Sequence, residues 1–250
     1  MIVLKTDREI KIMQEAGRIS AMALKLAGEA VEPGVTTYEL DSIIKKYIIS
    51  QGASPSFFNY DGFPASSCIS VNNMVIHGIP SKKQILKAGD IVSIDVGANF
   101  EGFHGDNANT FACADISDRA RSLIDATRES FYEALKKVVT GARIGDIGNA
   151  VEGYVKVRGY SVVRDFVGHG VGAKLHEDPS VPNYGTPGRG ARLLKGMTIA
   201  IEPMINEGTS DIEILDNGWT VVTADGKLSA HYENTIAITE NGPIILTKAE

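Results

Sequence analysis

Two carboxylic acids stand at matching places in two strand-like segments of the chain. In residues 91–96 the even positions are all apolar and Asp95 lies on the opposite face. In residues 198–202 two isoleucines take the apolar face and Glu202 takes the other. Because side chains alternate across a strand, each acid is placed on the smaller, more polar side of its strand.

A second pair of acids, Asp106 and Glu233, accompanies the first. Residues 106–111 resemble residues 233–238, so we expect each of these acids to lead a strand. If a pseudo-twofold axis relates the two halves of the chain, all four carboxylates meet near it. Like charges in contact cannot all stay ionised. Two divalent cations would neutralise four negative charges, so the acids predict a metal centre.

The fifth ligand that we expect is His169, in the segment Gly168-His169-Gly170-Val171-Gly172. Flanking glycines allow close backbone approach and the unusual dihedral angles of a ligand loop, although a buried histidine can also be purely structural. Four carboxylates with one imidazole and no cysteine favour Mn, Fe(II) or Co, with Zn also compatible. A paired-metal centre lowers the pKa of bound water, which suits hydrolysis of an amide or a phosphoester.

The elements that would position these residues follow one order in each half. Two capping boxes, Thr6-x-x-Glu9 and Thr36-x-x-Glu39, predict the starts of the first two helices. Apolar residues at helical spacing predict the second pair of helices, and short β-branched runs predict strands. The expected helices cover 7–30, 37–52, 117–139 and 145–158, and the expected strands cover 68–71, 75–77, 91–96 and 198–202.

A constant spacing of 107 positions relates the halves. It joins Asp95 to Glu202 and five further pairs: Gly34 and Gly141, Leu40 and Ile147, Tyr47 and Tyr154, Gly52 and Gly159, Gly89 and Gly196. Amphipathic patterns can produce accidental matches, but a gapless series across two helices and a strand favours a duplicated α/β unit. We therefore expect a single α+β domain over 1–250, with pseudo-repeats at roughly 7–112 and 115–240.

Composition and net charge limit the classes of partner that the chain is expected to bind. The net charge is −6, and no run of four basic residues occurs, which argues against nucleic acid. The two cysteines are too few for a disulfide framework. No stretch approaches the length of a membrane span, and the first residues turn charged too early for a signal peptide. We expect a cytoplasmic monomer with no membrane partner.

An ordered set of motifs resembles the type I methionine aminopeptidases over essentially the whole chain. That resemblance implies the "pita-bread" fold, in which two pseudo-symmetric α/β halves surround a central curved antiparallel sheet. It also implies removal of the N-terminal methionine from nascent proteins near the ribosome, with small second residues favoured. The matching segments are 70–80, 94–96, 102–106, 168–172, 175–179, 198–204 and 229–235.

The resemblance assigns roles to individual residues. It makes Asp106 and Glu233 ligands that bridge two divalent ions, gives Asp95 to one ion, and gives His169 with Glu202 to the other. It implies that a hydroxide activated by the ions attacks the first peptide bond and that Glu202 shuttles the proton. The catalytic histidines that it implies are His77, near the scissile amide, and His176, at the scissile carbonyl.

The implied methionine pocket consists of Tyr60, Phe63, Cys68, His77, Leu175 and Trp219. Leu175 and Phe63 stand where the family often has Phe and Tyr, so we expect slightly relaxed rejection of other first residues. We expect no cysteine-rich zinc-finger extension before residue 1. Only 25 residues separate His176 from Glu202, too few for the insertion of type II enzymes.

Three further residues lie outside the predicted ligands and the predicted pocket. His104 is expected to be structural and Cys113 to lie in the core. His231 stands where the family often has Gln, and its parity with Glu233 places it on the metal face, where it could be an outer hydrogen-bond donor or a structural residue. Two competing functions are a proline-directed peptidase of the same fold and a non-catalytic peptide-binding module.

Overall fold

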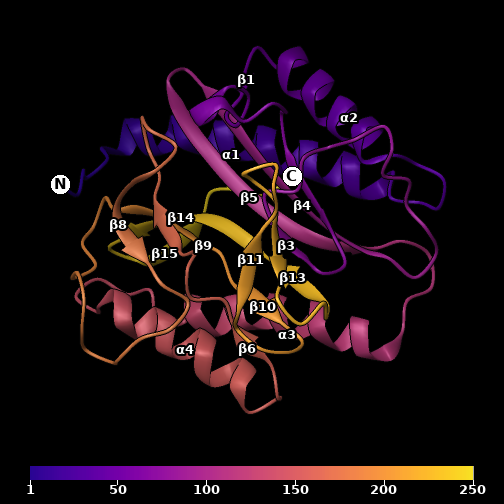
Figure 1. The fold of residues 1–250 in the computed structure, drawn as a ribbon. Coiled ribbons are helices and arrows are strands. Elements are labelled where there is room, and N and C mark those ends of the chain that lie inside the picture. The colour runs from indigo at the N-terminus through magenta and orange to yellow at the C-terminus, as the bar shows by residue number, and fades with distance from the viewer. Residues whose placement is uncertain (250) are drawn as a thin grey trace.

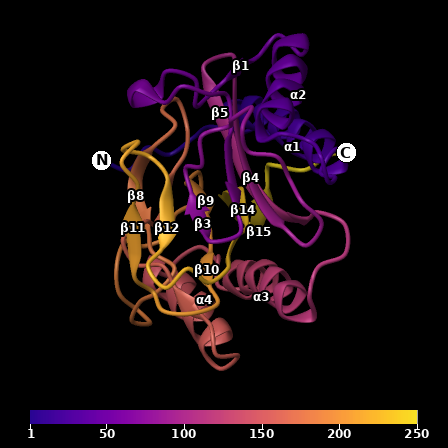
Figure 2. The ribbon, with the colours of Figure 1, turned by 45° about the vertical axis from the view of Figure 1, so that its right-hand side comes forward.

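A computed structural model describes residues 1–249 and contains two pairs of helices. The first half contributes α1 (Asp7–Glu29) and α2 (Thr37–Ser50), and the second contributes α3 (Asp118–Leu135) and α4 (Ile144–Lys156). Both predicted capping boxes are confirmed: the Thr6 and Thr36 hydroxyls accept from the backbone three residues later, and the glutamates reach back. Each pair lies together on its own side of the molecule (Figures 1 and 2).

The second pair differs slightly from its predicted bounds. Helix α3 ends at Leu135 rather than at 139, because the next amides bond three residues back, Lys137 to Ala134 and Val138 to Leu135, each over about 3 Å. This tighter turn directs Val138 into the core, where it is fully buried. Helix α4 covers 144–156 rather than 145–158.

A nine-stranded antiparallel sheet curls through the centre of the molecule (Figure 1). Its main path runs in the order β1-β4-β5-β14-β9-β7-β8, with β2 added to β4 and β15 added to β14. The long hairpin of β4 and β5 belongs to the first half, and β14 and β9 belong to the second. The strands are β1 (Ser54–Pro55), β2 (Cys68–Val71), β4 (Ile91–Phe100), β5 (Phe103–Ala112), β7 (Gly168–Gly170), β8 (Glu177–Val181), β9 (Thr198–Ile201), β14 (Glu233–Thr239) and β15 (Gly242–Ile245).

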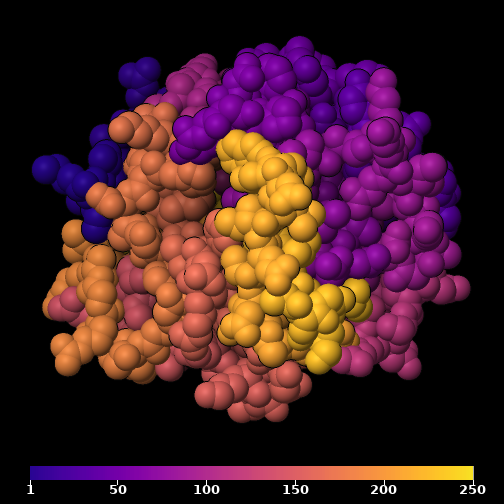
Figure 3. Space-filling model, in the orientation of Figure 1, coloured from indigo at the N-terminus to yellow at the C-terminus, as the bar shows by residue number. Residues whose placement is uncertain are grey.

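Two three-stranded sheets flank the central one, in the orders β13-β10-β6 and β11-β12-β3. Figure 3 shows the segment around β11 and β12 (yellow) as a ridge on this face between residues of the first half (purple) and of the second half (orange). The remaining elements are the short helix η1 (Tyr60–Gly62) and the strands β3 (Met74–Ile76), β6 (Ser161–Val162), β10 (Met204–Asn206), β11 (Ile212–Ile214), β12 (Val221–Thr223) and β13 (Ser229–His231).

Backbone hydrogen bonds repeat at the spacing found in the sequence. The amide of Gly34 donates to the carbonyl of Leu86, and the amide of Gly141 donates to that of Leu193, both over 2.9 Å. Each bond joins the start of the second helix in its half to the loop before the central strand. The isolated bridges Thr36–Ile85 and Arg143–Arg192 repeat the same relation. The two pseudo-symmetric halves are therefore present in the backbone as well as in the sequence.

Apolar packing follows the same symmetry. Ile94 on β4 is fully buried against Leu40 of α2, and Ile201 on β9 is fully buried against Ile147 of α4. Burial of such a side chain contributes about 1.5–3 kcal/mol each. Within residues 1–249, no helix is long and apolar enough to cross a membrane.

Asp106 does not lead a strand, contrary to the prediction. It is the fourth residue of β5, because a two-residue turn lets β4 run on to Phe100 and β5 start at Phe103. The turn residues Glu101 and Gly102 adopt φ of 48° and 83°, the left-handed conformation that such tight hairpins require. Glu233 does begin its strand, β14.

The sheet register also corrects the proposed pairing of Asp106 with Glu233. The β4–β5 ladder joins Ile94 to Asn109, and the β9–β14 ladder joins Ile201 to Asn234. Since Ile94 and Ile201 are equivalent, Asn109 and Asn234 are equivalent too. Counting back along each strand, the counterpart of Asp106 is His231 and the counterpart of Glu233 is Ala108. The backbone is therefore symmetric, but Asp106 and Glu233 do not occupy equivalent positions in the two halves.

Candidate metal centre

A cavity of about 450 Å³ opens on the face of the sheet that carries the acids. On β5, Phe111 is turned toward α1, where it closely approaches Gly28, and alternation places Asp106 on the opposite face. All five residues expected as ligands line this one cavity, at one end of it. They are Asp95, Asp106, His169, Glu202 and Glu233.

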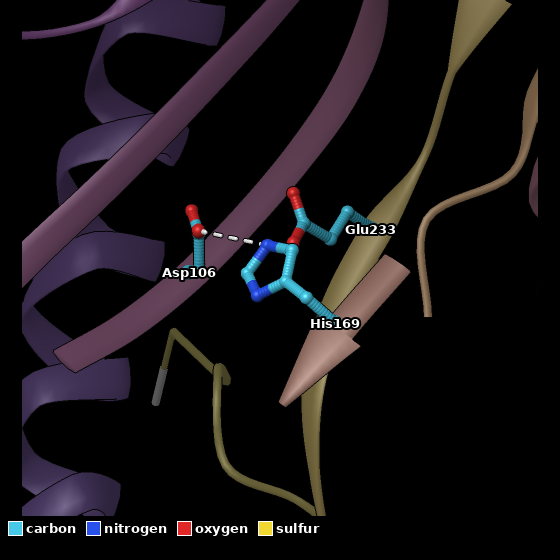
Figure 4. A group of neighbouring side chains, drawn as sticks. All are labelled: Asp106, His169 and Glu233. Carbon is cyan, nitrogen blue, oxygen red and sulfur yellow. Dashed lines mark ion pairs between the residues drawn. The ribbon is translucent and has the colours of Figure 1, made fainter. Parts of the chain in front are cut away.

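Three of these residues come from three different strands and point at one another (Figure 4). Asp106 on β5, His169 on β7 and Glu233 on β14 each offer one donor atom, and these atoms all lie within 4.8 Å of one another. Nε2 of His169 lies 4.0 Å from Oδ2 of Asp106 and 3.5 Å from Oε1 of Glu202. Such separations between donor atoms suit a shared cation.

The other two acids, Asp95 and Glu202, come from β4 in the first half and from the end of β9 in the second half. Asp95 on β4 pairs with Cys68 of β2 on one side and with Ala108 of β5 on the other. Glu202 follows the last residue of β9, and its backbone carbonyl accepts from the Asn183 side chain over 2.9 Å. Both acids therefore stand on fixed backbone.

Burial makes the unneutralised cluster unfavourable. It raises the pKa of Asp106 to about 7, and burial together with the Asp106 charge holds the pKa values of Asp95, Glu202 and Glu233 well above their usual range. Among residues 1–249, the buried atoms Oδ1 of Asp95, Oδ1 of Asp106 and Oε1 of Glu233 have no hydrogen-bond partner. Buried oxygens without partners are costly, and cations would satisfy them. The residues thus fit divalent metal ions.

The hydrogen bonding and protonation state of the His169 ring suit it to bind a metal ion. Its Nδ1 donates to the carbonyl of Gly170 over 2.9 Å, which leaves Nε2 unprotonated and facing the acids. Burial lowers the pKa of His169 to about 3, so the ring stays neutral at physiological pH. A neutral imidazole with a fixed tautomer is the form that binds metals.

The glycines around His169 are required by close packing. A Cβ at Gly168 would lie 2.4 Å from the carbonyl oxygen of Ala200, and one at Gly170 would lie 2.3 Å from that of Asp178. Strand β7 is therefore pressed between β9 and β8, and only glycine fits on either side of the histidine. This agrees with the close backbone approach expected from the sequence.

The two other predicted histidines line the same cavity. Nδ1 of His176 lies 2.8 Å from the Tyr60 hydroxyl, and its ring centroid lies 4.2 Å from that of His169. His77 adopts φ of 57° and packs edge-on against Phe166 and Trp219. Burial lowers the pKa of both histidines, that of His77 to about 4. Both rings are therefore neutral and close to the acids without belonging to the acid cluster.

An apolar cluster forms another part of the cavity wall. Five of the expected pocket residues belong to it, with the rings of Phe63 and Trp219 5.1 Å apart. They are Tyr60, Phe63, Cys68, Leu175 and Trp219. Phe57, Ile76 and Phe166 also line the cavity and were not predicted as pocket residues, although Ile76 lies within the matching segment 70–80. The periodicity of their segments gave no signal for them.

His231 and His104 lie where their interpretations place them. His231 is 2% exposed, and its Nε2 lies 3.8 Å from Oε2 of Glu202, so it faces the cluster. His104 instead bonds Asn99 and Ser56 through its two ring nitrogens, both over 2.8 Å. Its hydrogen bonds are satisfied by the protein, as for a structural histidine. Cys113 is fully buried in the first-half core.

Two threonines that no sequence pattern predicts hold the backbone at the centre of symmetry. The Thr235 hydroxyl accepts from the amide of Asp106 and donates to its carbonyl, over 3.0 and 2.8 Å. Its counterpart Thr110 bonds the amide and carbonyl of His231 in the same way, over 2.9 and 2.8 Å. Each half thus fixes one residue of the other at the cavity floor.

Comparison with known proteins gives consistent matches. Residues 11–240 match the model of metallopeptidase family M24. A methionine aminopeptidase of Clostridium perfringens is 57% identical over 247 residues, which cover 99% of each chain.

Solved structures agree with this. The crystal structure of methionine aminopeptidase from Thermotoga maritima superposes with a TM-score of 0.98 at 45% identity, covering 99% of this chain and 100% of that one. Prolidase from Pyrococcus furiosus reaches a TM-score of 0.79 at 25% identity, covering 99% of this chain and 66% of that chain. The expected fold, with its curved antiparallel sheet between two pseudo-symmetric halves, is confirmed.

Proposed function

The chain belongs to metallopeptidase family M24, and we propose that it removes the N-terminal methionine from peptides and nascent proteins. The observation that carries this proposal is a single cavity with two unlike ends. One end presents four acids, of which Asp106 and Glu233 are buried, and a neutral imidazole, and the other is an apolar cluster. High identity to methionine aminopeptidases such as that of Clostridium perfringens supports the choice of substrate.

We assign five ligands to two divalent ions. Asp106 and Glu233 would be shared by both ions, Asp95 would belong to one ion, and His169 with Glu202 would belong to the other. When bound, the ions supply an activated water at neutral pH and a positive centre for the substrate amine. Mn, Fe(II) or Co suits this oxygen-rich set, and Zn is compatible with it.

The protein's own groups orient the peptide and move the proton. His176, fixed through Nδ1 by the Tyr60 hydroxyl, presents Nε2 as a donor to the scissile carbonyl oxygen. His77 holds the peptide near the scissile amide from the opposite side. Glu202 accepts the proton of the attacking water and passes it to the leaving amine. These three residues act on substrate or water.

The apolar end supports selection of methionine. An unbranched thioether fits a cavity walled by aromatic rings and Leu175, with favourable contacts between sulfur and aromatic edges. Phe63 and Trp219 meet edge to face in this part of the cavity wall. The free amine must reach the acids, so formylated or acetylated peptides are excluded. A small second residue is favoured, by analogy with the type I family.

The setting that we propose follows from the same activity. Nascent polypeptides emerging from the ribosome in the cytoplasm are the substrates, and the enzyme acts on them as a monomer with one catalytic domain. The limits of the two pseudo-repeats, 7–112 and 115–240, stay predictions.

Kinetics on matched tripeptides test the substrate. We expect kcat/KM to be highest for Met-Ala-Ser and about 10–200-fold lower for Leu-Ala-Ser, the usual range for a small change in an apolar group. Loss of activity is expected for Met-Lys-Ser, whose second residue is large. Faster turnover of Ala-Pro-Ser than of Met-Ala-Ser would assign the chain to the proline-directed enzymes of the fold.

A further inference from the structure

A buried ion pair lies beside the cavity and takes no part in its lining. Nζ of Lys5 lies 2.5 Å from Oε2 of Glu177, and the two side chains are 3% and 9% exposed. Lys5 precedes α1, whereas Glu177 is the first residue of β8 and directly follows His176. The pair therefore joins the start of the chain to the catalytic histidine's neighbour, 172 residues away.

Both partners are fixed by further hydrogen bonds. Oε1 of Glu177 accepts from the amide of Lys174 over 3.1 Å and closes a turn that carries Leu175 and His176. The amide of Lys5 donates to the carbonyl of Gly196 over 2.7 Å, and its Nζ also donates to the carbonyl of Val3. One carboxylate thus holds the turn with one oxygen and the N-terminal segment with the other.

The segment that follows the strand of His169 leaves space for this pair. A Cβ on Gly172 would lie 2.4 Å from Cε of Lys5 and 2.5 Å from Oε1 of Glu177. The third glycine of the Gly168–Gly172 segment therefore leaves the space that the ion pair fills. The carbonyl of Gly172 also accepts from the amide of His104 on β5 over 2.9 Å, so this glycine lies between that strand and the ion pair.

We propose that Lys5 and Glu177 are positioning residues for His176, an inference that rests on the proposed function. The Tyr60 hydroxyl fixes the ring of His176, and the ion pair fixes the backbone on its other side. Without the pair, the turn at 174–177 keeps its internal hydrogen bond but loses its buried attachment to the N-terminal segment, and only the exposed ion pair of the Met1 amino group with Asp178 remains nearby. His176 then meets the scissile carbonyl less accurately.

A positioning role and a purely stabilising role of the ion pair predict different effects of substitution. A buried ion pair adds little net stability, whereas removing one partner leaves an unpaired buried charge and is strongly destabilising. Lys5→Met should therefore lower both Tm and kcat. The double variant Lys5→Met with Glu177→Gln buries no charge, so it should regain most of the Tm while its turn remains untethered.

The decisive measurement is steady-state kinetics of the metal-loaded single and double variants on Met-Ala-Ser. We expect kcat of the double variant to stay about tenfold to a hundredfold below wild type, the cost of misplacement near 1 Å, with metal content unchanged. KM should change by less than about twofold, since the interaction is made in the transition state. Lys195→Met, which removes an exposed ion pair with Glu240, is the matched control and should keep wild-type kinetics. Recovery of kcat together with Tm in the double variant would overturn the proposal.

Hydrogen exchange gives a readout that needs no catalysis. In metal-free protein, amides of residues 173–178 should exchange faster in both Lys5 variants than in wild type and in Lys195→Met. Unchanged exchange there would overturn the tether. If wild type itself fails to cleave methionyl peptides, the proposed function falls, while the exchange experiment still decides whether Lys5 holds the turn.

Discussion

Burial acts in opposite directions on the acids and the imidazoles of the cavity. It raises the pKa of Asp106 to about 7 and lowers that of His169 to about 3. Without cations, the cavity therefore favours neutral acids beside neutral rings. Divalent ions change the preference, because they stabilise the ionised carboxylates and accept the free electron pair of His169. The ligand set is thus matched to metal in charge and in protonation state.

Substitution of Asp106 tests the proposed set of metal ligands most directly. It holds both ions in the proposed scheme, so Asp106→Asn should weaken metal binding by more than about a hundredfold, beyond the loss usual for outer partners of ligands. Isothermal titration of metal-free protein with Mn(II) measures this. Asp146→Asn makes the same change at the half-buried start of α4, away from the cavity, and should bind metal normally. Equal affinities in the two variants would exclude Asp106 as a ligand.

His176 should affect chemistry without affecting metal content. His176→Ala removes the donor proposed for the scissile carbonyl, so we expect kcat to fall about 10²–10³-fold. Tyr60→Phe removes only the hydrogen bond to Nδ1 and should cost about three- to tenfold. Metal analysis of the purified variants is the control. Loss of metal in proportion to activity would instead make His176 a ligand.

Strands β5 and β14 meet at the pseudo-twofold axis and carry the two acids assigned to both ions. Glu233 pairs with Ala108 across this junction, and Thr235 bonds both backbone groups of Asp106. The position of Asp106 therefore depends on a side chain from the other half. Its symmetry-related clamp, Thr110, holds His231 in the same way.

This symmetry provides a matched pair of variants. Thr235→Val leaves the amide and carbonyl of Asp106 without their hydroxyl partner, so metal affinity should fall about 10–100-fold, as for other outer partners of ligands. Thr110→Val makes the same change beneath His231, which is not assigned as a ligand, and should lower affinity much less. Thr235→Ser keeps the hydroxyl and should restore binding. Equal losses from the two valine variants would show that the clamp contributes only general stability.

The sequence predicted the elements and the five clustered residues better than it predicted their register. Asp95 and Glu202 could be related because both lie in apolar strands at one constant spacing. Asp106 was placed wrongly, since the tight turn at 101–102 lengthens the hairpin and moves the acid into the interior of β5. No local pattern reveals that His231 is its counterpart, because the register depends on hydrogen bonds between distant strands.

Contacts between residues far apart in the chain could not be predicted from the sequence. The hydroxyl of Tyr60 meets His176 over 116 positions, and Lys5 meets Glu177 over 172. Neither pair shares a motif or a period. Each exists only because the two halves fold onto one sheet and bring loops from both to the same rim of the cavity.

At the scale of the whole molecule, metal and protons should control stability together. Buried His77, His169 and His231 have pKa values well below the ordinary 6.5, so they destabilise the fold only as pH falls below 6.5. The buried acids have raised values, so they destabilise it as pH rises above the ordinary 3.8 of Asp. Between pH 6.5 and 8, of these groups only the acids contribute.

The Tm of metal-free protein should therefore fall as pH rises from 6.5 through about 7, the folded pKa of Asp106. Added Mn(II) should raise the Tm more at pH 8 than at pH 6.5, because ions bind the ionised acids and release protons at lower pH. Thermal unfolding at both pH values, with and without Mn(II), measures the effect. A metal-free Tm that rises over this range would contradict the burial of ionisable acids.

The central claim is that these residues make a metal-dependent enzyme that releases methionine from a free N-terminus. Its most direct test is the release of free methionine from Met-Ala-Ser by metal-depleted protein titrated with Mn(II), with formyl-Met-Ala-Ser in a parallel series. We predict no release without metal, a rate that saturates by about two equivalents as in paired-metal sites, and no release from the formylated peptide. Methionine release at full rate in the presence of a chelator, or equal release from the formylated peptide, would contradict the claim.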